Sequence, residues 1–442
     1  MIGRLGRSGS IARNSALNLV GFTVPLVVGL LAVPVITREL GAARFGLLAL
    51  AFAILEYSSL FDLGLGAATT REVSGALARK DKGVGSLIAG SVLSQAMLGS
   101  IGALILFGVS SVLVDRVFVV PDELRSEAVA VFRILALMIP ATVVLLSLRG
   151  ILEAAGRFDL SVGIRIPSSV ATFLIPAVAA SQGYGLPAIL VMLLVTRVLI
   201  CLVMAYAIRQ VLPGQSWDFG MRWETMRPLF VFGGWMSLSN MLSPVLIYLD
   251  RFMLAAIVGV AAVGYYTAPF DTVMRLLVIP AALMGAVYPS VAGMAAIGHD
   301  ASVRRVYSQA IRKTLAMIAG PALVIGIAGP WLLELWLGPT FAAQALDAVR
   351  ILSAGVFLHA ISRVPSGFIN ALGRPDIIAK ISILEMIVHV PVAWMLISAY
   401  GLNGAALAWT LRVSVDAVLL FLASSRVLTK FAASVRPAVQ LR

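Results

Sequence analysis

The chain has 442 residues, of which 60% are hydrophobic and only 12% are charged, and its mean hydropathy is +0.98. A soluble domain carries about 25% charged residues, so this composition excludes a water-facing globular protein. The excess of 34 Lys and Arg over 21 Asp and Glu is typical of cytoplasmic loops in membrane proteins, and no nucleic-acid partner is expected.

Apolar runs of about 20 residues predict twelve membrane-spanning helices, because a helix satisfies every backbone polar group within its own segment. The runs are continuous rather than alternating, which argues against a β-barrel. The first run follows a basic start that resembles a signal peptide but continues to Ile36, so we expect it to be retained as a helix. The predicted spans are 14–37, 45–66, 85–113, 128–148, 166–182, 187–208, 229–257, 262–293, 314–333, 351–369, 378–398 and 403–424.

The basic residues between these spans predict the orientation. With the N-terminus placed in the cytoplasm, 23 basic residues fall on the cytoplasmic side, 5 on the opposite side and 6 inside spans. Basic residues accumulate on the cytoplasmic side of membrane proteins. We therefore expect a multi-pass protein of the cytoplasmic (inner) membrane, in contact with membrane lipids, with both termini in the cytoplasm.

The two halves of the chain repeat each other. "GAARFGLLALAF" (41–52) matches "GVAAVGYYTAPF" (259–270) at a shift of 218, and "AGRFD" (155–159) matches "LGRPD" (372–376) at 217. "YGL" recurs at 184 and 400, a shift of 216, and "TRV" at 196–198 matches "LRV" at 411–413, a shift of 215. Six spans separate the copies, an even number, so the repeats have parallel topology. This predicts an N-terminal lobe over 1–208, a cytoplasmic linker over 209–228 and a C-terminal lobe over 229–442.

Several segments carry a family resemblance. The run "RNSALNLVGFTVPLVVGLLAVPVITRELGAARFGLLALAF", "FDLGLGAATTREVS", "YLDRFMLAAIVGVAAVGYYTAPFD" and "FINALGRPDIIAK" resemble the polysaccharide-transport family of lipid-linked oligosaccharide flippases. These flippases belong to the multidrug/oligosaccharidyl-lipid/polysaccharide exporter superfamily. The resemblance covers essentially the whole chain. It implies an all-α polytopic membrane protein in which two six-helix lobes flank a central cavity lined by helices 1, 2, 7 and 8. It also implies alternating access for a polyprenyl-diphosphate-linked oligosaccharide, with glycan-assembly proteins as further partners.

Charged residues inside the seventh and eighth spans are the first candidates for a site. Asp250 and Asp271 each lie about ten residues from the connecting turn, roughly 15 Å along the helix axis. Polar residues Ser237, Asn240 and Ser243 share a face with Asp250 and Arg251, while Thr267, Asp271 and Arg275 form one stripe. We expect Arg251, Arg275 and Asn240 to contact substrate, because arginine forms bidentate bonds with phosphate. The alternative is structural, with Arg251 pairing with Asp271 or Asp271 with Arg275.

Other charged residues are candidates for ion coupling or gating. Glu56, shifted by 218, falls one residue from Arg275, so the two occupy corresponding places in the two lobes; otherwise Glu56 bonds to Tyr57, Ser59 or a neighbouring helix. Glu385 and His389 share a helix face at i, i+4, a spacing suited either to a proton relay or to an interhelical contact. Together with Asp250 and Asp271 they are the residues expected to couple transport to Na⁺ or H⁺. Arg412 and Asp416, also at i, i+4, suggest a structural pair.

The sequence contains no catalytic constellation. It has no G-x-x-x-x-G-K-[ST] loop, and its single cysteine and three histidines are too scattered for a metal site, so we expect neither a metal nor a cofactor. A membrane glycosyltransferase, polymerase or ligase would need a sizeable extramembrane domain, which the short loops do not provide. A cation-coupled multidrug exporter or a lipid II exporter of the same superfamily remains an alternative, although Arg251 and Arg275 favour an anionic headgroup over a lipophilic cation.

Overall fold

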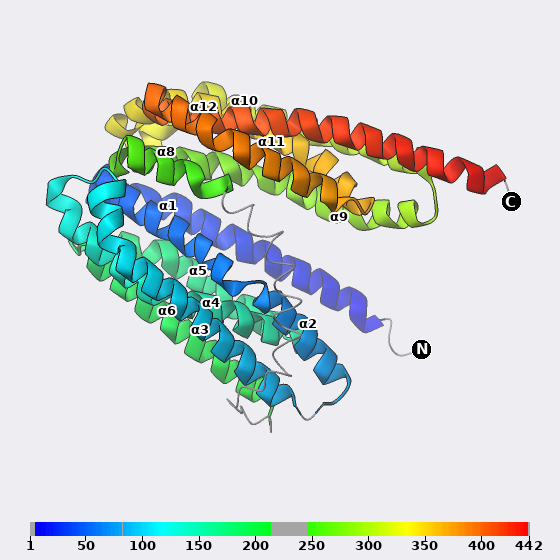
Figure 1. Cartoon of the computed structure of the whole chain (residues 1–442), viewed down its shortest axis with the longest axis horizontal. Helices are drawn as coiled ribbons and strands as arrows, with labels where there is room; N and C mark the ends of the chain where they lie inside the picture. The colour runs from blue at the N-terminus through cyan, green and yellow to red at the C-terminus, as the bar shows by residue number, and fades with distance from the viewer. Residues whose placement is uncertain (1–4, 82, 214–245, 441–442) are drawn as a thin grey trace. The chain divides into compact units, whose positions relative to one another are not determined.

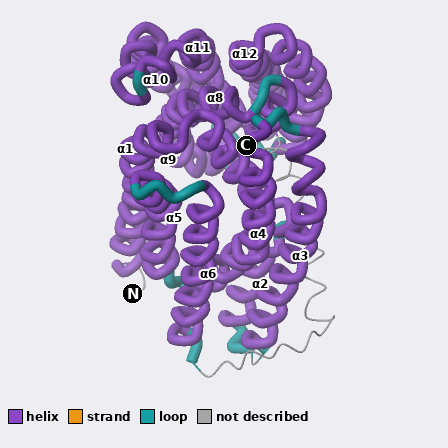
Figure 2. Tube along the Cα trace, turned by 90° about the vertical axis from the view of Figure 1, so that its left-hand side faces the viewer, coloured by secondary structure: helices purple, strands orange, loops and turns teal. Residues whose placement is uncertain are grey.

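The protein is seen in a computed structural model that describes residues 5–81, 83–213 and 246–440. These described residues form helices joined by short loops, with no strand among them (Figure 2). The predicted all-α fold class is therefore confirmed. Most of the predicted linker at 209–228 and most of the seventh span lie outside the described residues, and the linker's first residues, 209–211, belong to the end of α6.

Two of the helices contain a hairpin. α1 (Leu5–Tyr57) includes Gly41 at φ 74° and ψ 167°, and α12 (Pro375–Gln440) includes Gly401 at φ 57° and ψ −128°. At each glycine the chain reverses, so that two arms run back along each other (Figure 1). Each of these helices therefore supplies two predicted spans.

The remaining helices follow one another with few intervening residues. In the first half they are α2 (Leu65–Ala78), α3 (Val84–Val112), α4 (Arg125–Ala154), α5 (Phe158–Ser181) and α6 (Leu186–Val211), with short helices η1 (Ser58–Asp62), η2 (Leu113–Val117) and η3 (Asp122–Leu124). The second half has a helix over 246–257, then α8 (Val260–Met274), η4 (Arg275–Leu277), α9 (Val278–Ala296), α10 (Asp300–Leu337) and α11 (Pro339–Ala371).

The helices are long and apolar enough to cross a membrane. Nine such stretches occur in the part of the chain that the structure describes, and two of them contain the hairpins at Gly41 and Gly401. Every one of the twelve predicted spans overlaps a described helix, the seventh only over 246–257. The chain is a multi-pass membrane protein.

The sequence predicted the second and eighth spans as continuous helices, but in the structure both are interrupted. The predicted span 45–66 is interrupted by the 3₁₀ turn η1, after which Leu63 (φ 46°) and Gly64 (φ 69°) leave the right-handed helical conformation before α2 begins. The predicted span 262–293 is interrupted by the 3₁₀ turn η4. Hydrophobicity does not reveal these breaks because apolar residues flank both. They stand at corresponding places in the two halves, and a 3₁₀ stretch inside a longer helix often marks a functional hinge.

The repeated "GR-x-D" segments adopt the same local structure. Gly156 and Gly373 have φ of 73° and 74°, which only glycine adopts without strain. In both copies the arginine donates two bonds to the aspartate two residues later, at 3.0 and 3.0 Å for Arg157 and at 2.9 and 3.0 Å for Arg374. The same backbone turn therefore ends α4 in the first half and α11 in the second, as the internal repeat predicts.

Inter-residue contacts divide the chain into two compact units, Met1–Val245 and Leu246–Arg442. The first contains a core of α2, α3, α4 and α6 side chains, including Leu65, Val73, Ile88, Ile151 and Ile208. The second contains cores around Val291, Val303 and Phe368 and around Ile318 and Ala360. The predicted lobe boundaries and the cavity between the lobes stay predictions.

Candidate functional site

The second unit buries two adjacent charged residues on the helix over 246–257. Asp250 and Arg251 are 1% and 3% exposed, so the polar face expected there is covered by neighbouring helices. Arg251 donates from Nη2 to Asp271 Oδ1 on α8, and its guanidinium lies 5.1 Å from the Tyr248 ring centroid and 5.6 Å from that of Phe270. The Asp271 side chain, in contrast, is 48% exposed. Of the two structural pairs expected for Asp271, the structure contains the one with Arg251.

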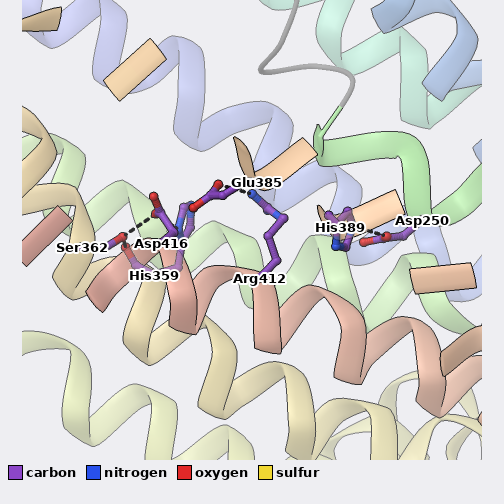
Figure 3. Close-up of polar contacts among 7 residues, drawn as sticks. All are labelled: Asp250, His359, Ser362, Glu385, His389, Arg412 and Asp416. Carbon is purple, nitrogen blue, oxygen red and sulfur yellow. Dashed lines mark hydrogen bonds and ion pairs between the residues drawn. The ribbon is translucent and has the colours of Figure 1, made fainter. Parts of the chain in front are cut away.

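Asp250 faces away from this pair and bonds to α12. His389 Nε2 lies 2.9 Å from Asp250 Oδ1, and both side chains are 1% exposed (Figure 3). The other carboxylate oxygen, Asp250 Oδ2, is buried without a hydrogen-bond partner among the described residues. A buried ionisable pair inside a membrane span is costly and marks a functional candidate.

One turn before His389 lies a second group, which we call the carboxyl cluster: Glu385, Asp416, Arg412, His359 and Ser362. Arg412 Nη1 lies 3.8 Å from Glu385 Oε2, and Ser362 donates to Asp416 Oδ2 at 3.2 Å. His359 Nδ1 lies 3.9 Å from the same Asp416 oxygen. The cluster joins α11 to both arms of α12 (Figure 3). Arg412 thus pairs with Glu385. Its charge also acts on Asp416, the partner expected from spacing, although no ion pair within 4 Å joins these two described residues.

The carboxyl cluster contains two acidic side chains, Glu385 on the first arm of α12 and Asp416 on the second. A carboxyl group can take up a proton, and an ionised carboxylate can bind a cation. The cluster therefore offers groups that can hold a proton or a cation.

Several polar atoms around these groups have no hydrogen-bond partner among the described residues. Besides Asp250 Oδ2 they include Glu385 Oε1, Arg412 Nε, Arg251 Nε, Tyr266 Oη and Thr267 Oγ1. Buried polar groups are normally bonded, and an unpaired one costs about 1–3 kcal/mol. Their concentration within one unit indicates a place where water or an ion completes the bonding.

Arg275 differs from Arg251 in its surroundings. It begins η4 and is partly exposed, and no ion pair within 4 Å or hydrogen bond joins it to another described residue. Asn240, the other expected substrate contact, lies outside the described residues. Of the two arginines expected to contact substrate, Arg275 is therefore the one whose charge is not paired with a carboxylate of the described residues.

In the first unit, Glu56 is exposed near the end of α1. Its charge acts on Arg197 of α6, which donates from Nη1 to Thr142 Oγ1 at 2.6 Å. This interaction with α6 supports the expectation that Glu56 interacts with a neighbouring helix. Arg197 corresponds to Arg412 in the matching "TRV" and "LRV" segments, so each half places a partly buried arginine near a glutamate.

A further buried acid in the first unit has a structural arrangement. Asp62 Oδ1 accepts hydrogen bonds from the backbone N–H of Gly66, at 2.9 Å, and from Gln95 Nε2. Gln95 in turn accepts from the backbone N–H of Ser147 at 3.2 Å. Asp62 thus caps the first turn of α2 and ties it to α3 and α4.

Sequence reasoning did not identify Asp62, Gln95 or Arg197 as site residues, and it took Arg412 and Asp416 as a structural pair. For the two arginines a signal existed, since the "TRV" and "LRV" repeat brings them into register. The roles of Asp62 and Asp416 depend on which helices pack together, and helix spacing alone does not reveal this.

Comparison with known proteins begins with families. The chain matches the family described as "Polysaccharide biosynthesis protein" over residues 11–294 and the MatE family over residues 236–395. A Shigella flexneri protein whose name assigns it O-antigen transport is 30% identical over 419 residues, covering 93% of this chain and 97% of that protein. A Haloferax volcanii protein named as the flippase AglR is 23% identical over 417 residues, covering 92% and 82%.

Solved structures share the fold. An inward-facing multidrug resistance transporter of the same superfamily superposes with a TM-score of 0.78 at 16% identity, covering 93% of this chain and 98% of that one. A superfamily transporter from Pyrococcus furiosus superposes with a TM-score of 0.65 at 17% identity and covers 96% of both chains. At this identity the likeness establishes the fold alone.

Proposed function

Because the chain belongs to the polysaccharide-transport family of the multidrug/oligosaccharidyl-lipid/polysaccharide exporter superfamily, we propose that it carries a polyprenyl-diphosphate-linked oligosaccharide across the cytoplasmic membrane. The transport step would supply the assembly of a surface polysaccharide such as O-antigen, capsule or exopolysaccharide. The glycan headgroup would cross between the two lobes by alternating access while the polyprenyl chain stays in lipid. Both termini would face the cytoplasm, as the distribution of basic residues predicts.

The observation that carries this proposal is the uncompensated arginine at the break between α8 and α9. Arg275 is partly exposed, inside a membrane span, and without an ion-pair partner among the described residues. Charge inside a span is retained where it lines a polar path or binds a ligand. A guanidinium suits a diphosphate because its donors match two phosphate oxygens at once.

Arg251 would act differently from Arg275. In the structure its guanidinium is occupied by Asp271 and by two aromatic rings. It would reach a headgroup only when the pair with Asp271 opens. Arg251 and Asp271 would then work as a gate, while Arg275 supplies the standing contact.

A transport assay separates these roles. Deleting the gene should leave the lipid-linked oligosaccharide on the cytoplasmic leaflet and abolish exported glycan, and the intact gene should restore export.

Arg275→Gln should lower export about tenfold or more at normal protein abundance, because a hydrogen bond to a charged group contributes about 1.5–3 kcal/mol. Arg275→Lys should recover part of it. Arg133→Gln, at an arginine of α4 that lies over the Phe107 ring, is the matched control and should export normally. Unchanged export after gene deletion, with no second flippase present, would contradict the proposed function.

We further propose that the buried acids of the second unit couple transport to an ion. Asp250 with His389, and Glu385 with Asp416, present carboxyl groups with unpaired oxygens inside the unit. Proton or Na⁺ binding there would neutralise charge that otherwise resists movement through the low-dielectric interior. Glu56 and Asp271, both more exposed, would gate access rather than hold the ion.

The ion is identified with purified protein in proteoliposomes. Transport driven by a pH gradient and insensitive to Na⁺ would assign H⁺, and the reverse would assign Na⁺. Glu385→Gln fixes the neutral form of one acid, so it should make transport independent of whichever gradient is effective. Glu153→Gln, at a cytoplasmic-side acid bonded to Arg149, is the control and should keep that dependence. A Glu385→Gln protein that still responds fully to the gradient would refute the coupling role.

A multidrug exporter is the second candidate, supported by the MatE match and the fold of the transporter structures. Overproducing the protein in a strain that lacks its major drug exporters distinguishes the two. Lowered susceptibility to lipophilic cations, together with unimpaired glycan export in the deletion strain, would favour drug export.

A further inference from the structure

The second unit contains a cavity at the end where two of its helix connections meet. Its volume is about 380 Å³, within the range of small-molecule sites. It lies between the start of α8, just after Gly259, and the α12 hairpin at Gly401, with α11 as its third side (Figure 1). This is the end predicted to face away from the cytoplasm, and no residue of the carboxyl cluster lines the cavity.

The walls combine aromatic rings with uncharged polar groups. Tyr265, Gln344, Tyr400 and Asn403 line the cavity together with small and branched apolar side chains. None of the lining residues carries a charge. A phosphate or a metal ion would require charged or multiple anionic partners, so the cavity does not suit either.

The polar groups lack protein partners. Asn403 Oδ1 is buried without a hydrogen bond among the described residues, and in that part of the chain no hydrogen bond occupies the side chains of Tyr265, Gln344 or Tyr400. An amide provides two donors and an acceptor, and a tyrosine hydroxyl provides one donor and can also accept. The polar groups of Gln344, Tyr265 and Tyr400 can therefore pair with a ligand in the cavity, and the Asn403 amide can do so once its covered oxygen is turned toward it.

The aromatic wall is partly fixed in place. The Tyr265 ring packs edge-to-face against Phe341, with the ring centroids 4.9 Å apart. Tyr400 is 61% exposed and forms the open side. A ring fixed by its neighbour offers a binding surface at little entropic cost.

We propose that this cavity binds one uncharged sugar residue of the glycan. A pyranose ring presents C–H groups on its faces, which pack on aromatic rings, and hydroxyls at its edge, which pair with amides and phenols. The arrangement of Tyr265, Tyr400, Gln344 and Asn403 supplies both kinds of contact in one place. The inference rests on the proposed function, since it gives the transporter a contact for the carbohydrate separate from the arginines proposed for the diphosphate.

Saturation-transfer NMR on the purified full-length protein in nanodiscs tests the site directly. The probes are methyl glycosides of neutral hexoses, 6-deoxyhexoses, pentoses and N-acetylhexosamines. At least one should receive saturation from the protein, and Tyr400→Ala or Asn403→Ala should reduce the signal to that of empty nanodiscs. Tyr400→Phe should retain most of it because the ring remains.

The chain offers a matched control. Tyr184 stands at the position corresponding to Tyr400 in the "YGL" repeat, is 47% exposed and does not line this cavity. Tyr184→Ala should bind the same glycoside as the unaltered protein. Thermal unfolding of each variant in the same nanodiscs confirms that a lost signal is not a lost fold.

Two results would overturn the inference: no saturation transfer to any of the glycosides, or equal transfer in the Tyr400→Ala and Asn403→Ala proteins. The binding assay requires no transport, so it separates the two proposals. Glycoside binding in a protein whose deletion leaves glycan export intact would contradict the proposed function alone. Glycan export without binding at this cavity would contradict the sugar site alone.

Discussion

The two 3₁₀ breaks, η1 in the first unit and η4 in the second, occupy corresponding places in the repeat but differ in what surrounds them. At η1 the break ends in two residues with positive φ, Leu63 and Gly64, and Asp62 bonds to Gly66 and Gln95, so the break is closed by its own hydrogen bonds. A Cβ added to Gly102 of α3 would come within 2.8 Å of the Phe61 ring, so η1 is also tightly packed. At η4 the backbone stays close to helical, and Arg275 has no ion-pair partner among the described residues.

This difference shows how a repeat can keep its helices and diverge in chemistry. The first copy uses its polar side chain to stabilise the fold, whereas the second leaves the Arg275 cation partly exposed and without an ion pair among the described residues. A helix break whose polar groups are all hydrogen-bonded within the protein favours a rigid backbone, whereas a break with an unbonded polar group favours ligand binding. The variants below test this division, from the largest expected loss of stability to the smallest.

The largest loss should follow Asp271→Ala. It leaves the Arg251 guanidinium, 3% exposed, without its carboxylate. Removing one partner of a buried pair costs about 3–5 kcal/mol, and the exposure of Asp271 places the expected loss near the lower end. Arg251→Gln should cost less, about 1 kcal/mol, because Asp271 can be solvated. Chemical unfolding in detergent measures both.

The double variant Arg251→Gln/Asp271→Asn completes this test. It leaves no unpaired charge and should recover most of the stability lost in Asp271→Ala. Glycan export by the double variant then decides between gate and simple structural pair. Full export would remove Arg251 and Asp271 from the mechanism.

Asp62→Ala should destabilise the first unit by about 2 kcal/mol. It removes the cap of α2 and leaves the amide of Gln95 without its acceptor. Export per molecule of folded protein should be unchanged, since Asp62 has a structural role. Arg275→Gln should show the opposite pattern, with stability unchanged and export lost. If Asp62→Ala abolished export at normal stability, the contrast between the two breaks would fail.

A smaller and equal loss should follow alanine at the two repeated turns. Gly156 and Gly373 have φ of 73° and 74°, and a Cβ at either would meet nothing within 4 Å. The cost is therefore conformational, about 1–2 kcal/mol each. Gly163→Ala, in the middle of α5 and equally unobstructed, is the control and should stabilise by up to about 1 kcal/mol. Unequal losses at Gly156 and Gly373 would show that the two turns are not equivalent in energy.

The smallest effect should come from the ion pairs next to those turns. Arg157 with Asp159 and Arg374 with Asp376 are solvent-accessible pairs, and such pairs contribute little to stability. Asp159→Asn and Asp376→Asn should leave the unfolding midpoint within experimental error. A clear loss in only one of them would indicate that this pair has an additional role in its unit.

Local sequence patterns determined much of this protein. Twelve apolar runs, the distribution of basic residues and the matched segments predicted an all-α membrane protein with a parallel repeat, because a lipid environment demands long apolar helices with internally bonded backbones. Gly41, Gly156, Gly373 and Gly401 also end or reverse helices where turn residues indicated boundaries. Arg251, Asp250 and Asp271 were recognised because charge stands out in an apolar run.

Tertiary structure alone decided which of these charges meet. Asp250 bonds to His389, which is 139 residues away, and Glu385 lies 3.8 Å from Arg412 across the α12 hairpin. Spacing along a helix establishes which residues share a face but not which helix lies opposite that face. The breaks at η1 and η4 were missed for a similar reason, since each lies where other helices pack on it, α3 and α4 on η1 and α11 on η4. Arg275 remains available for a ligand because Asp271, one helical turn before it, forms its ion pair with Arg251.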